Sequence, residues 1–129
     1  SPSRGLGDVY KRQILRILPG GSYKEPHLKN AVNILSTDVR ISLAIMRKAI
    51  LGIGYDGFFI HALSGMNIKC VAIFGGHMSK KIMHYENNIC IEYNHPMTPC
   101  GAMNDCWHCK QANTYITVDM VEEACMKLV

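Results

Sequence analysis

The sequence lacks any apolar run long enough to cross a membrane. A membrane-spanning helix needs about 18–20 consecutive apolar residues, and no stretch of the 129 residues approaches that length. The N-terminus also lacks the basic-then-apolar pattern of a secretory signal. Charged residues make up only 19 % of the chain and hydrophobic residues 48 %, a balance typical of a globular domain with a core. We therefore expect a cytoplasmic globular protein without a transmembrane segment.

The chain also has little excess charge. Its formal net charge is +4, and it falls to +2 without residues 1–13, which hold three basic residues and one acidic residue. An excess of this size does not indicate a nucleic-acid partner. We therefore expect none.

The first residues show no apolar periodicity. Residues 3–13 read Ser-Arg-Gly-Leu-Gly-Asp-Val-Tyr-Lys-Arg-Gln, a string that resembles a translated sequencing-library adapter. This resemblance implies that residues 1–13 are a non-native peptide to be set aside in fold reasoning. The native part is then expected to begin near Ile14, inside a larger protein, and residues 14–129 suit one truncated domain.

Short apolar stretches that suit strands alternate with stretches of helical periodicity. Lys69–Phe74 is almost unbroken in its apolar character, which predicts a strand covered on both faces of a parallel sheet. Asp38–Ala49 has apolar residues at helical spacing and predicts an amphipathic helix. The other predicted strands are Ile14–Leu18, Ala31–Leu35, Ile50–Gly54 and Asn88–Tyr93, and the other predicted helices are Phe58–Met66, a short one at Ser79–Met83, and a closing helix with Val121, Ala124, Cys125 and Leu128 on its apolar face and Thr117 or Asp119 as its cap. This order predicts an α/β fold with an open parallel sheet.

Two glycine-bearing turns follow neighbouring predicted strands. Ligands of such sheets bind beyond the carboxyl ends of the strands, and the first amides of a helix suit a diphosphate. Gly57 opens the helix after the first turn and lets the backbone approach a ligand closely, and Gly75–Gly76 begins the second turn, which includes Ser79. Phosphate binding is not the only explanation of these turns. The first could be an ordinary structural turn and the second a flexible connection, and His61 could be an interior histidine with no role in binding.

Taken together, these motifs resemble the C-terminal domain of the glycosyltransferase family that includes the lipopolysaccharide heptosyltransferases. The resemblance runs from Arg40 to about Val121. The matching residues are Asp56-Gly57-x3-His61-Ala62, Val71-Ala72-Ile73-Phe74-Gly75-Gly76, Tyr85, Pro99-Cys100-Gly101 with Cys106 and Cys109, and Ile116-x-Val118-x2-Val121. The resemblance implies a partial Rossmann-like parallel sheet that forms the C-terminal half of a GT-B glycosyltransferase.

The resemblance also implies a donor site. By position, Asp56, Gly57 and His61 correspond to the donor-site motif, and Gly75, Gly76 and Ser79 to the second donor loop. Phe58 departs from the pattern, because the family usually has a glycine or another small residue there. The implied partners are a nucleotide-diphosphate-sugar donor, possibly of heptose, a glycan or lipid-linked acceptor, and an N-terminal domain that this chain lacks.

No residue of the chain suggests itself as the base that deprotonates the acceptor, so the catalytic residues stay unknown. The resemblance places that base on the N-terminal domain, and we expect the isolated chain to be inactive. Amides at Gly57 and Gly75–Gly76 suit the other task, which is to stabilise the departing nucleotide diphosphate. The alternative functions are a noncatalytic, degenerate nucleotide-sugar-binding module and a zinc-stabilised interaction module.

Three of the six cysteines form the spacing Cys100-x5-Cys106-x2-Cys109, with His95 and His108 nearby. Three thiols and a histidine are enough for a structural zinc site. The spacing alone leaves a zinc site, a disulfide and free thiols open, and it favours free thiols, as a reducing cytoplasm does. The sequence therefore predicts no cofactor and no catalytic metal, with structural zinc at Cys100, Cys106, Cys109 and His108 as the less favoured alternative.

Overall fold

The computed structural model describes residues 13–19, 26–36, 38–104 and 106–129. Apart from Gln13, the peptide predicted to be non-native lies outside these residues. The chain divides into two compact units, residues 1–45 and 46–129. No described helix combines the length and the apolar character that a membrane span requires.

The first unit contains a two-stranded parallel sheet. Strands β1 (Leu15–Pro19) and β2 (Val32–Ser36) pair in parallel. Helix α2 (Val39–Met46) follows, and the Arg40 amide donates to Asp38 Oδ1 at 2.8 Å. An Asp side chain that accepts from the second helical amide is a typical N-cap. Both predicted strands and the predicted helix are thus confirmed, with ends that differ by one to three residues.

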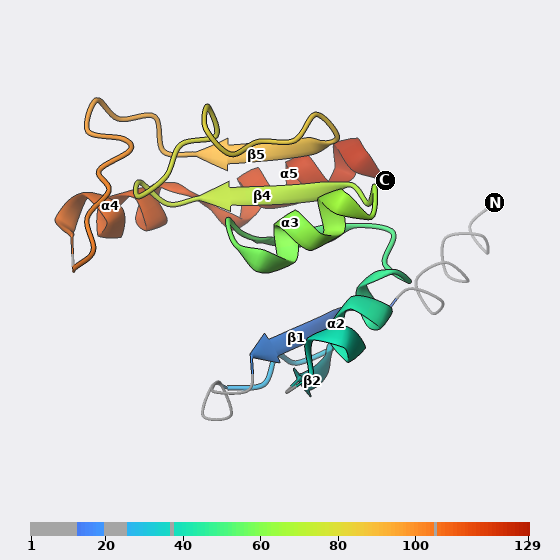
Figure 1. Cartoon of the computed structure of the whole chain (residues 1–129). Helices are drawn as coiled ribbons and strands as arrows, with labels where there is room; N and C mark the ends of the chain where they lie inside the picture. Colours follow the sequence, from blue (N-terminus) through green and yellow to red (C-terminus); the bar gives the residue numbers. More distant parts are fainter. Residues whose placement is uncertain (1–12, 20–25, 37, 105) are drawn as a thin grey trace. The chain divides into compact units, whose positions relative to one another are not determined.

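The second unit contains a three-stranded parallel sheet. Strands β3 (Gly52–Tyr55), β4 (Cys70–Phe74) and β5 (Asn88–Glu92) lie in the order β3-β4-β5. Figure 1 shows β4 and β5 with their arrowheads at the same edge. The parallel pairing is confirmed. The described strands nevertheless form two sheets, whereas the sequence predicted one open sheet.

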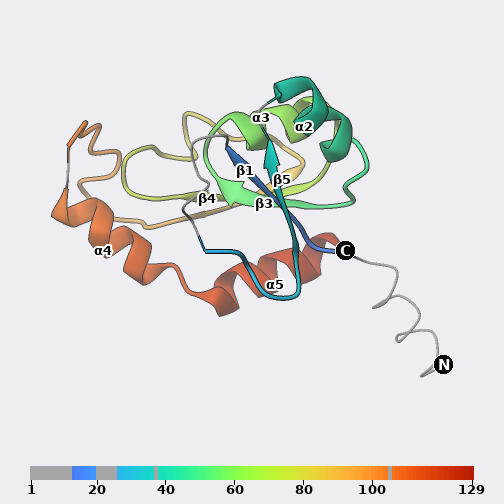
Figure 2. The same cartoon turned by 90° about the horizontal axis from the view of Figure 1, so that it is seen from below.

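Helices cover both faces of this sheet. Helix α3 (Phe58–Gly65) lies on one face and helix α5 (Val118–Leu128) on the other (Figure 2). On the α5 face, Val71 packs with Ile91 and Ala124. Cys70, Val71, Ala72 and Phe74 of β4 are all no more than 1 % exposed, so the strand is covered on both faces, as predicted. Val121, Cys125 and Leu128 also pack on this core and confirm the predicted apolar face of the closing helix.

The segment at Ser79–Met83 is a turn and not the predicted helix. The Ile82 amide donates to the Ser79 carbonyl at 3.0 Å, which closes one turn only. The Lys80 amide donates to Glu92 Oε2 at 3.0 Å, and the Lys81 amide donates to Ser79 Oγ at 3.2 Å. Side-chain acceptors of this kind compete with helical hydrogen bonds, which explains why the helix does not form.

A helix that the sequence did not predict lies within the cysteine-rich segment. Helix α4 (Trp107–Tyr115) lies beyond the carboxyl ends of β4 and β5 (Figure 1). It is mostly polar, so it has no apolar stripe for periodicity to detect. His108 and Ala112 are one helical turn apart, and both are fully buried. Tertiary packing of these two residues therefore stabilises a helix that local sequence patterns do not predict.

Thr117 is the N-cap of α5, one of the two caps predicted. Its Oγ1 accepts from the Met120 amide at 3.3 Å. We expect Thr117→Ala to lower the free energy of unfolding by about 1 kcal/mol, because the amide loses its acceptor. Urea titration followed by circular dichroism measures the difference.

Thr114→Ala is the matched control for this cap. Thr114 lies exposed within α4, and its hydroxyl donates to the Lys110 carbonyl at 3.1 Å. Alanine has the higher helix propensity, so this change should leave stability unchanged or slightly higher. Equal losses for the two variants would contradict the assignment of Thr117 as the cap.

Candidate functional site

The two glycine-bearing loops lie at the same edge of the sheet. Strands β3 and β4 are parallel neighbours, with Tyr55 opposite Ile73, and the Asp56 amide donates to the Ile73 carbonyl at 3.0 Å. The loop at 56–57 therefore begins beside the end of β4, where Gly75 begins the second loop. This is the arrangement predicted from the strand order, and it creates the edge at which parallel sheets bind ligands.

The first loop leads directly into α3. Gly57 is the N-cap of this helix, has an extended backbone, and makes no side-chain cap hydrogen bond. The first amides of a helix have no intrahelical acceptors, and the helix dipole adds partial positive charge there. Phe58, the departure from the family pattern, is 52 % exposed and packs edge-on against Phe59 with ring centroids 5.4 Å apart. The loop thus offers a helix N-terminus with an aromatic ring beside it.

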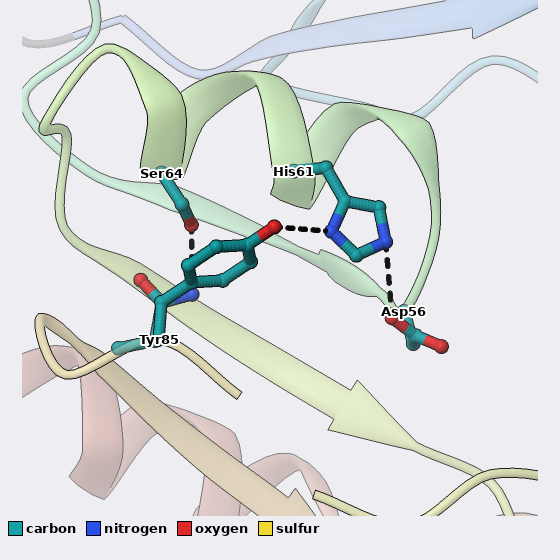
Figure 3. Close-up of polar contacts among 5 residues, drawn as sticks. Asp56, His61, Ser64 and Tyr85 are labelled. Atoms are coloured by element: carbon teal, nitrogen blue, oxygen red, sulfur yellow. Dashed lines mark hydrogen bonds and ion pairs between the residues drawn. The ribbon is translucent and has the colours of Figure 1, made fainter. Parts of the chain in front are cut away.

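Asp56, His61 and Tyr85 form a polar chain next to this N-terminus (Figure 3). His61 Nδ1 and Tyr85 Oη are 2.8 Å apart and share a hydrogen bond. His61 Nε2 lies 3.7 Å from Asp56 Oδ1, and the contact is an ion pair when the imidazole is protonated. The Asp56 oxygen is buried and accepts no hydrogen bond from any described residue. The His61 imidazole therefore links α3 to the segment before β5. Asp56 Oδ1 can still accept a hydrogen bond.

A second polar contact joins α3 to the start of β5. The Asn88 side-chain amide donates to Ser64 Oγ at 2.9 Å. Ser64 lies one helical turn after His61 on α3, and Asn88 is the first residue of β5. The contacts of His61 and Ser64 hold α3 in a fixed position relative to the strand edge.

The glycines of the second loop face α4. A side chain at Gly76 would place its Cβ 2.6 Å from His108 Cε1, and one at Gly75 would place it 3.2 Å from Asn113 Oδ1. Gly76 also has a φ of 28°, in the region that favours glycine. Both glycines are therefore explained by close packing within the protein, a role that the sequence could not reveal because α4 was not predicted.

Ser79 serves the shape of the same loop. It is only 5 % exposed, and its hydroxyl donates to Glu92 Oε2 at 3.3 Å. Glu92 is the last residue of β5, so this contact ties the second loop to the neighbouring strand. A cavity of about 220 Å³ beside the loop is lined by Ser79, Lys81, Ile82, Glu92, Asn94, His95, Thr98 and Pro99. A more open one of about 500 Å³ runs along β5 and α5 and includes Lys80, Lys81 and Lys127.

The cysteine-rich segment gathers a group of possible metal ligands. Cys100, Cys106, His108 and Cys109 each offer one ligand atom, and these atoms all lie within 4.8 Å of one another. Among the described residues His95 is outside this group; its ring stacks on Tyr93 with centroids 5.3 Å apart. The structure thus brings together the four residues that the sequence analysis named for structural zinc.

His108 occupies an unusual position in this group. It is fully buried, and its Nδ1 has no hydrogen-bond partner among the described residues. Leaving a buried polar atom unpaired costs about 1–3 kcal/mol. The other ring nitrogen, Nε2, lies 3.1 Å from Thr98 Oγ1. His108 therefore belongs to the thiol cluster and has one buried ring nitrogen without a hydrogen-bond partner among the described residues.

The thiols of the group differ in their affinity for protons. The amides of Cys109 and then of His108, at the start of α4, lower the pKa of the Cys106 thiol. The hydrogen bond between Cys100 and Cys109, whose Sγ atoms are 3.3 Å apart, is the main cause that raises the pKa of Cys109 to about 12. All three are free cysteines.

Comparison with protein-family models, with curated proteins and with solved structures finds no match for this chain. The family resemblance therefore stays a prediction that depends on the residues quoted above. The structure establishes a mixed α/β fold with parallel strands, two glycine-bearing loops at one sheet edge, and a thiol and imidazole cluster beside the second loop.

Proposed function

We propose that this chain is the nucleotide-diphosphate-sugar-binding part of a GT-B glycosyltransferase, with its sheet forming part of a Rossmann-like domain. The parent enzyme would transfer a sugar, possibly heptose, to a glycan or lipid-linked acceptor. The observation that supports this proposal most is the position of the two glycine-bearing loops at the carboxyl edge of the adjacent strands β3 and β4. The motif order from Asp56 to Val121 supports the same family.

In this proposal the diphosphate binds at the start of α3. Gly57 leaves space there, because a Cβ at this position would come no closer than 3.9 Å to another heavy atom, the Tyr55 carbonyl oxygen. The unpaired amides and the helix dipole favour a dianionic ligand. Protonated His61 would add positive charge beside Asp56, and the Asp56 side chain, which is 19 % exposed, would accept a hydrogen bond from a donor hydroxyl.

The second loop would act through its backbone. The side of Gly76 that lacks a Cβ faces His108, and the Ser79 hydroxyl donates to Glu92. We therefore assign these residues the task of shaping the loop beside the donor, and we assign Asp56, Gly57 and His61 the direct contacts. The base that activates the acceptor would come from the N-terminal domain, so the isolated chain should bind a nucleotide without catalysing transfer.

The test is calorimetric titration of the chain with uridine, adenosine and guanosine diphosphates, with Gly57→Asp and Gly57→Asn as paired variants. Gly57 has an extended backbone, and Asp and Asn are both favoured N-caps, so each variant should match the wild-type stability within a few tenths of a kcal/mol. We expect one nucleotide to bind the wild type. The new carboxylate should weaken that binding by at least about 10-fold relative to the Asn variant, because it repels the diphosphate.

The outcome separates the candidate functions. No binding of any diphosphate by the folded wild-type chain would refute the donor-site proposal and would favour an interaction module. Equal affinities of the Asp and Asn variants would place the nucleotide elsewhere on the chain. Loss of binding in the Asp variant alone, with unchanged unfolding curves, is the result that the geometry of α3 predicts.

A further inference from the structure

The cysteine cluster has the composition of a structural zinc site. Four-coordinate structural sites use Cys and His ligands, with zinc–sulfur distances of about 2.3 Å and zinc–nitrogen distances of about 2.0–2.1 Å. Ligand atoms around such an ion therefore lie roughly 3.4–3.8 Å apart. In the cluster the four ligand atoms lie within 4.8 Å of one another, and two of its sulfur atoms are 3.3 Å apart. Small adjustments of side chains suffice to reach tetrahedral geometry.

The hydrogen bonds of Thr98 determine which nitrogen of His108 is able to bind a metal. Thr98 Oγ1 donates its proton to the Tyr93 carbonyl at 3.2 Å. It is therefore an acceptor toward His108 Nε2, 3.1 Å away, and that nitrogen carries the ring proton. The lone pair then resides on Nδ1, the buried atom without a described hydrogen-bond partner. A ligating histidine whose other N–H is held by a neighbouring acceptor is the usual arrangement at zinc sites.

We propose that Cys100, Cys106, Cys109 and Nδ1 of His108 bind one structural Zn²⁺, oriented by Thr98. Four protein ligands close the coordination sphere, so the ion has no open position for catalysis. Three thiolates and an imidazole favour zinc over hard cations such as Mg²⁺ or Ca²⁺. The sequence alone favoured free thiols, and the buried, unpaired nitrogen of His108 is the observation that reverses this preference.

The ion would fasten the cysteine-rich segment to the rim of the sheet. The Cys100 amide donates to the Gly76 carbonyl at 3.0 Å, and the Gly101 amide donates to the His77 carbonyl at 3.4 Å. Cys106 is the N-cap of α4, and Cys109 lies in its first turn. One ion would therefore join the start of α4 to the segment that pairs with the second glycine-bearing loop. Zinc binding at this cluster does not depend on nucleotide binding.

The primary test measures metal content. The full chain, produced in medium with Zn²⁺ and purified with reductant, should contain one zinc per chain by inductively coupled plasma mass spectrometry. Cys100→Ser, Cys106→Ser and Cys109→Ser should each reduce this content to near zero. Cys90→Ser and Cys125→Ser are matched controls, because these cysteines are free and lie outside the cluster, and both should retain the metal.

A second measurement keeps the proposal testable if a ligand variant fails to fold. Titration of the metal-stripped wild-type chain with Co²⁺ should produce thiolate charge-transfer and tetrahedral d–d absorption bands, and Zn²⁺ should bleach the d–d bands. Thr98→Ala should weaken Zn²⁺ binding by about 10–100-fold, since the histidine loses its orienting partner. Thr114→Ala, at an exposed position of α4, should leave the affinity unchanged.

Three results would overturn the proposal. The first is a folded, fully reduced chain without stoichiometric metal and without the Co²⁺ bands. The second is an intact mass two hydrogens lower, which would show a disulfide within the cluster. The third is an equal loss of metal from the control variants and from the ligand variants.

Discussion

Phe74→Ala should lower the free energy of unfolding by about 3–5 kcal/mol. Phe74 is the last residue of the central strand β4 and is 1 % exposed. Truncation removes a buried ring and leaves a cavity, because neighbouring side chains relax only partly. The loss is a large share of the 5–15 kcal/mol that stabilises a typical domain. Denaturant unfolding measures this loss. Phe74→Leu leaves a smaller cavity and should show a smaller loss, so it can be measured even if the alanine variant does not fold.

Phe58→Ala is the matched control, since it removes the same ring from an exposed position. Phe58 is 52 % exposed, and its main ring contact is with Phe59. We expect a loss of about 1 kcal/mol or less, of the size of one aromatic pair. If Phe58→Ala and Phe74→Ala lowered the free energy of unfolding equally, burial of Phe74 in β4 would not account for its contribution to stability. The same variant also removes the ring beside the proposed diphosphate site.

Gly76→Ala should lower the free energy of unfolding by about 2–4 kcal/mol. One part of this loss is the left-handed backbone, with a φ of 28°, which costs a non-glycine residue about 1–2 kcal/mol. The other part is overpacking, because the new Cβ would lie 2.6 Å from Cε1 and 2.9 Å from Nδ1 of the fully buried His108 ring. Unfolding in urea, followed by the circular dichroism signal of the helices, measures the sum.

Gly101→Ala separates these two contributions. Gly101 has a φ of 62°, and a Cβ there would have no heavy atom within 4 Å. This variant should therefore show the backbone cost alone, about 1–2 kcal/mol. If both alanine variants lose the same stability, the contact between Gly76 and His108 is not tight. A larger loss at Gly76 supports the packing of α4 on the second loop.

The sequence predicts the elements whose stability depends on apolar periodicity. Strand β4 is recognised because its residues are apolar on both faces, and α5 because Val121, Ala124 and Leu128 share one face. The same reasoning predicts that Gly57 and Gly75 lie at one edge, since parallel neighbouring strands end at the same side. These predictions follow from local patterns and from the geometry of parallel sheets.

The sequence does not predict contacts that depend on polar side chains far apart in the chain. Helix α4 is polar, and its position depends on burial of His108 against Gly76, residues that no local pattern connects. Likewise, the turn at Ser79–Met83 depends on Glu92, the last residue of β5. The environment of His108 also depends on tertiary structure, which places Thr98 beside one ring nitrogen and leaves the other buried without a partner among the described residues. The histidine was identified in the sequence, but its environment was not.

The pairing of residues 100 and 101 with residues 76 and 77 makes two distant parts of the chain mutually dependent. The segment after β5 cannot detach without leaving carbonyl groups of the second loop without their partners. Thermodynamic linkage makes this effect reciprocal, so that whatever restrains one side raises the free energy of opening the other. The free energy needed to open the loop at residues 76 and 77 therefore depends in part on residues 100 and 101, which lie beyond the next strand in the sequence.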